Sequence, residues 1–283
     1  MRYHWIRFYA HGLFTLALCG SYISAARAQF VIEPLRAVLT EETQSAAFTL
    51  VNTADRLLHV DVSMVDLEAT LEGYRPAQPD HRTAVSAAPW LTLYPATLTL
   101  EPGERQTIRV DLRTDQPLPH GHERRTHLYV EASPPRAGVR KVSDRGIGLD
   151  LGVGVSVPVL VRPSGALNHA PPSEKPVRFE DTSLVRGADG SILLTSTLTS
   201  GAEDVDLAAR PRRSVYGAIC VAGAAGTAKA CLQNIALYPD APGRRITLDL
   251  KTDALGPGLY RLTYEGRAED GGRALARENF RVE

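Results

Sequence analysis

Short runs in which every second residue is apolar recur along most of this chain. Leu58, Val60, Val62 and Met64 form one such run, and Thr107 to Leu112 forms another. Side chains on a β-strand point alternately to opposite faces, so this spacing predicts strands with one buried face. Turn residues separate the runs, and signals for helices are nearly absent. The pattern therefore predicts an all-β chain built as β-sandwiches.

A segment rich in Pro, Gly, Ser and Asn divides the strand pattern into two halves. Its prolines cannot continue the interior of a sheet, and the chain length of 283 residues suits two domains. We place a linker at 165–176, a first sandwich domain at 29–164 and a second at 177–283. The expected fold is two β-sandwich domains in tandem.

The first 28 residues predict a secretory signal peptide. Arg2 and Arg7 give it a positive start, a short apolar run around Leu13 to Leu18 follows, and Ala26 and Ala28 supply small residues for cleavage. The apolar run is too short for a lasting membrane span. We therefore expect a mature chain beginning at Gln29 that does not insert into a membrane.

Composition narrows the class of protein further. Lys and Arg together number 32, as do Asp and Glu, so the formal net charge is +0 and gives no support to nucleic-acid binding. After cleavage only Cys220 and Cys231 remain, and in an oxidising compartment an even pair predicts a disulfide. Two thiols without a nearby His would be a poor zinc site.

The longest alternating stretch runs from Ile147 to Val161. Eight aliphatic side chains fall on every second position, and the positions between them are mostly small. Glycine weakens a central strand and Pro158 cannot donate to a neighbouring strand, which favours an edge strand. A long aliphatic edge is an aggregation hazard, and the use that fits it is strand addition to another chain. The alternative is a strand whose aliphatic face belongs to its own core, because any half-buried strand alternates.

Several segments of the first half resemble the PapD-like periplasmic chaperones of the chaperone–usher pilus pathway. They come in family order, from Arg36-Ala37-Val38-Leu39 to the exit at Val161-Arg162-Pro163, with the following pieces between: Phe48 to Thr53, Pro89-Trp90-Leu91, Tyr94-Pro95, Leu100 to Glu104, Ile108-Arg109-Val110 and Glu123 to Leu128. The resemblance covers Phe30 to about Pro163, and the second half matches mostly by architecture.

The resemblance implies an immunoglobulin-like first domain, a second sandwich set at an angle, and a cleft between them that binds the carboxyl terminus of a pilin. In the family two basic residues anchor that carboxylate, and Arg36 corresponds to one of them. The position of the second, a lysine in the donor strand, holds Pro158 here. Arg162, Arg125 and Arg124 stay open as replacements, with Arg162 taken as the working choice beside Arg36.

The function we expect is that of a periplasmic chaperone. It would bind pilin subunits by donor-strand complementation and deliver them to an outer-membrane usher, without enzymatic activity, cofactor or metal. The donor residues are then Leu149, Leu151, Val153, Val155, Val157 and Val159. An exposed edge also leaves open a dimer in which two copies cap each other.

Other functions are weaker readings of the same sequence. The main alternative is a secreted adhesive or structural module whose alternating strand is paired internally. His120, His122 and His127 could form a copper or zinc site, but no thiol or carboxylate completes a recognisable motif. The chain lacks a Gly-x-Ser-x-Gly nucleophile elbow, and its paired glycines lie within a strand pattern rather than before a helix, so neither a hydrolase nor a nucleotide-binding site is expected.

Overall fold

The computed structural model describes residues 29–282, apart from 80–81, 83–84, 114, 116, 119–122, 136–137, 144–145, 151, 163–176, 188–190, 200–213, 224–225, 227, 239–240, 251–254 and 268–273. The predicted signal peptide therefore lies outside the described residues. So does the predicted linker, which leaves the exact domain boundary a prediction. Among the described residues there is no helix with the length and apolar character needed to cross a membrane.

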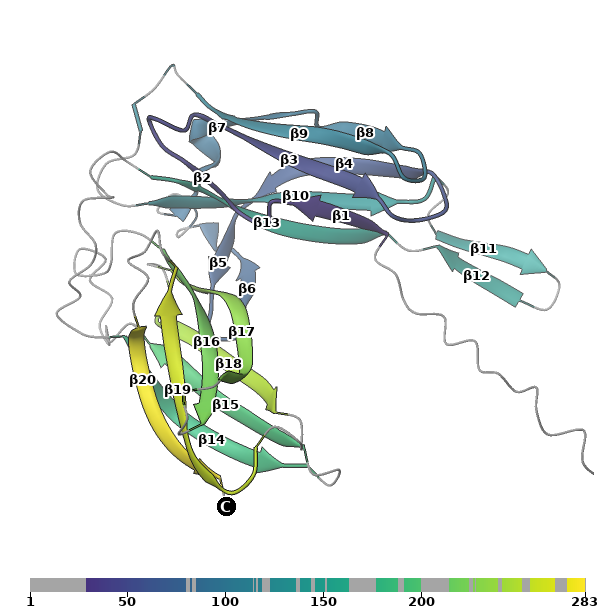
Figure 1. Ribbon diagram of the computed structural model, residues 1–283. Coiled ribbons are helices and arrows are strands. Elements are labelled where there is room, and N and C mark those ends of the chain that lie inside the picture. The colour runs from purple at the N-terminus through teal and green to yellow at the C-terminus, as the bar shows by residue number, and fades with distance from the viewer. Residues whose placement is uncertain are drawn as a thin grey trace, which may run out of the picture.

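The first half of the chain folds as a sandwich of two sheets (Figure 1). One sheet has the spatial order β1 (Phe30–Glu33), β3 (Ser45–Asn52), β9 (Arg105–Leu112), β7 (Leu91–Tyr94). The other has the order β2 (Ala37–Leu39), β13 (Val153–Val161), β10 (Arg124–Ser133), β4 (Leu58–Val65), β8 (Thr97–Leu100). A single-turn 3-10 helix, Ala88–Trp90, precedes β7.

Alternation of apolar residues explains why these strands pack together. On β3, Phe48 and Leu50 are fully buried, and on β10, Leu128 and Val130 are fully buried. These side chains meet between the two sheets in one continuous hydrophobic core. Removal of that apolar area from water is the main force that holds the sheets face to face.

Near its start, the chain crosses from one sheet of this sandwich to the other within a few residues. β1 pairs antiparallel with β3, whereas β2 pairs parallel with the last three residues of β13, Val159–Val161. Pro34, Leu35 and Arg36 make the crossing between the two sheets. The crossing places Arg36 immediately before the point at which β2 begins to cover β13.

The second half of the chain forms another sandwich. Its sheets have the orders β14 (Arg178–Arg186), β15 (Ile192–Thr199), β18 (Gly243–Leu250), and β17 (Ala228–Leu237), β16 (Val215–Gly223), β19 (Gly258–Gly266), β20 (Ala274–Val282). Cys220 on β16 lies opposite Cys231 on β17, and the two form the predicted disulfide. Figure 1 shows the strands of the two sandwiches running in clearly different directions. The predicted fold, two immunoglobulin-like sandwiches set at an angle, is confirmed.

A short hairpin joins the first sandwich to the second. It consists of β5 (Leu67–Ala69) and β6 (Tyr74–Pro76). The Arg245 amide donates to the Leu71 carbonyl oxygen at 2.7 Å, and the Arg245 side chain pairs with Glu72 at 3.0 Å. A small apolar cluster at the same junction is formed by Ala69, Leu160, Tyr216, Tyr238 and Ala241. These contacts connect the two sandwiches directly.

The stretch Ile147 to Val161 is not the single strand that its alternation predicts. Its first part lies in β12 (Gly146–Asp150), which pairs with β11 (Gly138–Ser143) as a separate two-stranded hairpin. Gly152 has no assigned secondary structure, and β13 begins at Val153. The prediction of one continuous strand is wrong because alternation records which face is apolar and does not record which strand is the hydrogen-bonding partner.

Candidate functional site

The free edge of β13 is the first component of the site. One side of β13 pairs with β10 along its whole length, from Val153 to Val161. In the part of the chain that the structure describes, the other side pairs only where β2 covers Val159–Val161. The edge from Val153 to Pro158 is therefore open to an additional strand. Figure 1 shows β13 at the lower margin of the first sandwich, as the edge position requires.

The side chains of β13 divide at its middle. Val153 is 40% exposed and Val155 is half-buried, whereas Val157 and Val159 are 1% and 0% exposed. The last two belong to the sandwich's own core. Val157 and Val159 are thus already used, and only residues before them can enter another chain. Of the other expected donor residues, Leu149 lies in β12 and Leu151 lies outside the described residues.

The opposite face of β13 is small for a structural reason. The ring of Tyr129 on β10 lies against Gly154, so closely that a Cβ atom there would stand 2.2 Å from the tyrosine oxygen. Ser156 and Pro158 are the next residues on this face, opposite Tyr129 and His127 of β10. Glycine at 154 therefore leaves room for the tyrosine beside the free edge.

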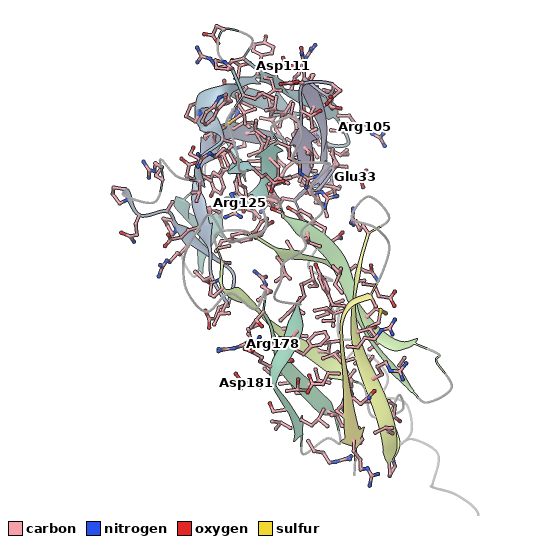
Figure 2. All side chains as sticks on the ribbon, turned by 90° about the vertical axis from the view of Figure 1, so that its left-hand side faces the viewer. Glu33, Arg105, Asp111, Arg125, Arg178 and Asp181 are labelled. Atoms are coloured by element: carbon pink, nitrogen blue, oxygen red, sulfur yellow. A yellow bond between two sulfur atoms is a disulfide. The ribbon has the colours of Figure 1, made fainter. Side chains whose placement is uncertain are left out.

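A cleft of about 730 Å³ lies where the free edge ends. Residues of both sandwiches line it: Glu33, Pro34, Leu35, Arg36, Ala47, Thr49, Tyr74 and Pro158 from the first, and Tyr216, Asn234, Ile235, Ala236, Tyr238, Arg244 and Arg267 from the second. Figure 2 shows Glu33 at the end of the first sandwich that faces the second. Arg36 and Pro158 thus line the same cleft. A smaller hollow of about 390 Å³ lies on the second sandwich alone, around Cys220 and Tyr260.

Arg36 is held against the second sandwich. Its guanidinium carbon lies 3.8 Å from the centre of the Tyr216 ring, within the range of a cation–π contact. Such stacking holds the planar cation in one orientation, and the edge of a guanidinium matches the geometry of a carboxylate. Since β2 starts at the next residue, the guanidinium stands at the end of the row that an added strand would occupy.

Three tyrosines form the floor of the cleft. The Tyr74 hydroxyl donates to that of Tyr238 at 2.7 Å, and the hydroxyls of Tyr238 and Tyr216 are 3.1 Å apart. Burial raises the pKa of all three phenols above the ordinary value, so they stay neutral. The sequence analysis did not connect these rings, because Tyr74 lies on β6, Tyr216 lies on β16 and Tyr238 directly follows β17.

His127 and Arg125 lie beneath this tyrosine layer. The His127 ring is fully buried and makes an edge contact with Tyr74, with 4.9 Å between ring centres. Burial, and secondly the charge of Arg125, lower the pKa of His127 to about 3. The Arg125 guanidinium lies 4.0 Å from the centre of the Tyr238 ring and donates to the Leu67 carbonyl oxygen at 3.1 Å. Figure 2 shows Arg125 at the junction of the sandwiches.

The histidines considered for a metal site, and Arg124 and Arg125, which were considered as a second anchor, are not found in the cleft. His120 and His122 lie outside the described residues, and within the described ones no three His, Cys, Asp or Glu side chains are grouped to hold a metal. Arg124 is half-buried, and desolvation lowers its pKa. Neither Arg124 nor Arg125 lines the cleft.

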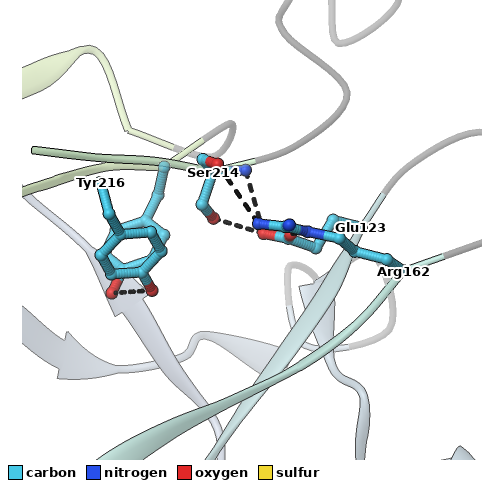
Figure 3. Close-up of polar contacts among 5 residues, drawn as sticks. Glu123, Arg162, Ser214 and Tyr216 are labelled. Atoms are coloured by element: carbon cyan, nitrogen blue, oxygen red, sulfur yellow. Dashed lines mark hydrogen bonds and ion pairs between the residues drawn. The ribbon is translucent and has the colours of Figure 1, made fainter. Parts of the chain in front are cut away.

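Arg162, the expected second anchor, lies elsewhere (Figure 3). Its side chain is 9% exposed and donates from Nε to Glu123, whose side chain is 2% exposed. The Ser214 amide donates to the same carboxylate at 3.0 Å, and the Ser214 hydroxyl is a further donor to it. Arg162 also reaches the Ser214 carbonyl oxygen at 3.5 Å. The ion pair thus lies within the first sandwich, and Ser214 connects it to the second, so we do not retain Arg162 as an anchor.

Comparison with known proteins agrees with this geometry. Residues 29–167 match the family model described as pili and flagellar-assembly chaperone, PapD N-terminal domain. No curated protein matches the chain.

Solved structures of pilus chaperones are similar to the chain at low identity. The Pseudomonas aeruginosa CupB2 chaperone is 13% identical over 89% of this chain and 98% of its own, with a TM-score of 0.44. The CsuC-CsuE chaperone–tip adhesion subunit complex of Acinetobacter baumannii is 15% identical over 90% of this chain and 98% of its own, with a TM-score of 0.43. For the Salmonella enterica SafA pilin in complex with the SafB chaperone, the identity is 14% over 91% of this chain and 99% of the matched chain, with a TM-score of 0.43. At these TM-scores, the family assignment rests on the matched sequence model.

Proposed function

Because this chain belongs to the PapD-like family of pilus-assembly chaperones, we propose that it holds unfinished pilin subunits by pairing them with the free edge of β13. The family consists of periplasmic chaperones rather than enzymes. In this proposal the chain reaches the periplasm through the cleavable segment 1–28 and passes its loaded subunit to an outer-membrane usher. The open edge from Val153 to Pro158, next to a cationic cleft, is the observation that carries the proposal.

Backbone pairing supplies much of the attraction. A strand added to β13 would satisfy the hydrogen-bonding groups along its unpaired side, each contributing about 0.5–1.5 kcal/mol net. Val153 and Val155 would cover apolar surface of the subunit, and full burial of such a side chain contributes about 1.5–3 kcal/mol. Leu149 and Leu151 extend the donor row on the sequence pattern alone. This division gives main-chain affinity together with side-chain specificity, as in other cases of strand addition.

The position of Arg36 favours one direction for the guest strand. β2 runs parallel to β13 and begins at Ala37, so a guest filling the open row ends in front of Arg36. If the guest is also parallel to β13, its carboxyl terminus is the end that meets the guanidinium. A terminal carboxylate and an arginine form a favourable charge-assisted pair, whereas a terminal ammonium would be repelled. We therefore propose a parallel guest whose last carboxylate binds Arg36.

Co-expression with a small pilin subunit tests the proposal. Val153→Arg places a charge in the donor row at an exposed position, and we expect it to abolish co-purification of the subunit. Val155 is a poorer choice because it also packs against the chain's own core. Val185→Arg is the matched control, since Val185 is an exposed valine on the edge strand β14 of the other sandwich. Arg36→Ala should weaken co-purification without abolishing it.

Hydrogen exchange separates this function from a purely structural module. In the free chain, amides of Val153 to Val157 that point toward the open side should exchange rapidly and become protected on binding of the subunit. Equal co-purification by the Val153→Arg and Val185→Arg variants, with strong protection of that edge in the free chain, would refute the proposal and favour the module. Dimerisation through the same edge stays a prediction, which sedimentation of the free chain at several concentrations can check.

A further inference from the structure

The cleft at the end of the donor row is strongly cationic. Its lining includes three arginines, Arg36, Arg244 and Arg267, against the single carboxylate of Glu33. Arg36 comes from the first sandwich and the other two from the second. Pro158 lines the cleft too, but it carries neither a charge nor an amide hydrogen. If one arginine of the first sandwich receives a carboxylate, any further cation in this cleft must come from the second sandwich.

Arg244 is the cation that the fold positions most firmly. It is the second residue of β18 and lies opposite Leu198 of β15. The residue after it, Arg245, is fixed to the β5–β6 hairpin by its contacts with Leu71 and Glu72. The residue before it is Gly243, where a Cβ atom would stand 2.4 Å from the Leu198 carbonyl oxygen. The backbone at Arg244 is therefore held on both sides.

The charge of Arg244 is directed into the cleft and is not neutralised by a described carboxylate. The side chain is half-buried, and its guanidinium carbon lies 5.9 Å from the centre of the Tyr74 ring. Within the described ranges, no ion pair joins Arg244 to an Asp or Glu. Arg245 has such a pair with Glu72, although it is next in sequence and more exposed. A half-buried cation without a counter-ion favours the binding of an anion.

Arg267 is less suited to the same role. It follows β19, is exposed, and donates from Nη2 to the Asn234 side-chain oxygen. Its guanidinium is therefore already occupied on one side and is better solvated than that of Arg244. Solvation weakens a charge interaction because water screens it.

We propose that Arg244 is the second cation that binds the terminal carboxylate of the guest strand, together with Arg36. This inference rests on the proposed function and adds the specific residue. It makes the carboxylate site a shared site of both domains, so that only the correctly docked pair of sandwiches forms it. The Tyr216 ring lies against the Arg36 guanidinium, and the Tyr74 ring lies near that of Arg244.

A pair of peptides that differ only at the carboxyl terminus tests this inference. The probe is a fluorescein-labelled twelve-residue peptide of alternating Val and Thr, made once as the free acid and once as the amide. We expect the unsubstituted chain to bind the acid roughly tenfold or more tightly than the amide. Arg244→Ala and Arg36→Ala should each remove most of that preference, while binding of the amide stays unchanged.

Controls and a rescue make the test specific. Arg105→Ala removes an exposed arginine of β9 that does not line the cleft and should leave the preference intact. Pro158→Lys in the Arg244→Ala background puts a cation back into the cleft wall and should restore part of the preference. Equal thermal unfolding of the variants and the unsubstituted chain shows that docking of the sandwiches is unaffected.

Three results would overturn the inference. An unchanged acid preference in Arg244→Ala, with a lost preference in Arg36→Ala or Arg267→Ala, would place the second cation elsewhere and leave the proposed function intact. Equal binding of acid and amide by the unsubstituted chain would remove the carboxylate site but not the strand addition. Failure of both peptides and of a pilin subunit to bind would refute the proposed function and this inference with it.

Discussion

The buried link between Glu123 and Arg162 offers a sharp test of what holds the two sandwiches together. Glu123 accepts from Arg162, from the Ser214 amide and from the Ser214 hydroxyl (Figure 3). Glu123→Gln keeps the size of the side chain and removes its charge. The Arg162 guanidinium then stays buried, at 9% side-chain exposure, and loses the charge of Glu123.

The expected cost follows from this burial. Removal of one partner from a buried ion pair costs about 3–5 kcal/mol, because solvent cannot replace the lost charge around the partner that remains. Arg162→Met should lie at the lower end of that range, since Ser214 still supplies two donors to the Glu123 carboxylate. The double variant removes both charges of the pair, so its cost should fall below the sum of the single costs by about 2 kcal/mol or more.

Urea unfolding measures these costs in each half of the chain. Trp90 is the only tryptophan after the predicted signal peptide, so its fluorescence reports the first sandwich. Far-ultraviolet circular dichroism reports both sandwiches, and two transitions that separate in a variant indicate that the link has been broken. Asp111→Asn is the matched control, because the Arg109–Asp111 pair is as short, at 2.7 Å, but has side-chain exposures of 63% and 36%.

Two outcomes would contradict the reasoning. The exposed control pair should contribute less than about 1 kcal/mol. If Glu123→Gln costs no more than Asp111→Asn, the buried carboxylate is not an important link. If the costs of Glu123→Gln and Arg162→Met simply add in the double variant, the two groups are not energetically coupled.

Two further predictions concern pH and redox state. His127 has a pKa of about 3 in the folded chain against about 6.5 when unfolded. Its contribution to stability is therefore complete above pH 6.5 and falls by about 1.4 kcal/mol for each pH unit below it. His127→Phe should flatten the dependence of the urea midpoint on pH between pH 6.5 and 5, whereas His59→Gln, at an exposed site, should not. The Cys220–Cys231 bridge has a sequence separation of 11; replacing both cysteines by alanine should lower the stability of the second sandwich by about 2–3 kcal/mol and leave the Trp90 transition in place, and an unchanged circular dichroism midpoint would show that the bridge adds no stability.

Local pattern was sufficient for a strand such as β4 and for the disulfide. The alternation from Leu58 to Met64 predicted a half-buried strand, and the structure has β4 over Leu58–Val65. The cysteine pair was predictable because only two cysteines follow the predicted signal peptide. The first prediction needs only the side-chain period over neighbouring residues, and the second needs only the number of cysteines.

The candidate site was predictable only in part. The sequence indicated an edge strand through Pro158 and a cation through Arg36, and the structure brings both to one cleft. It did not reveal that Val157 and Val159 serve the chain's own core, because the same alternation describes a donor strand and a core strand. It also did not connect Arg244 with the cleft, since nothing in the local sequence distinguishes that arginine from its neighbour Arg245.

The sequence by itself determined the all-β class, the two sandwiches, the bridged cysteines and the segment that contains the edge, because strand periodicity and turn residues act over a few positions. The tertiary structure decided which edge is free, which valines are already buried, and that Arg162 pairs with Glu123 while Arg244 faces the cleft. These outcomes depend on partners tens of residues away and on the angle between two domains. A side chain's burial and its counter-ion are properties of that packing, which no short stretch of the chain specifies.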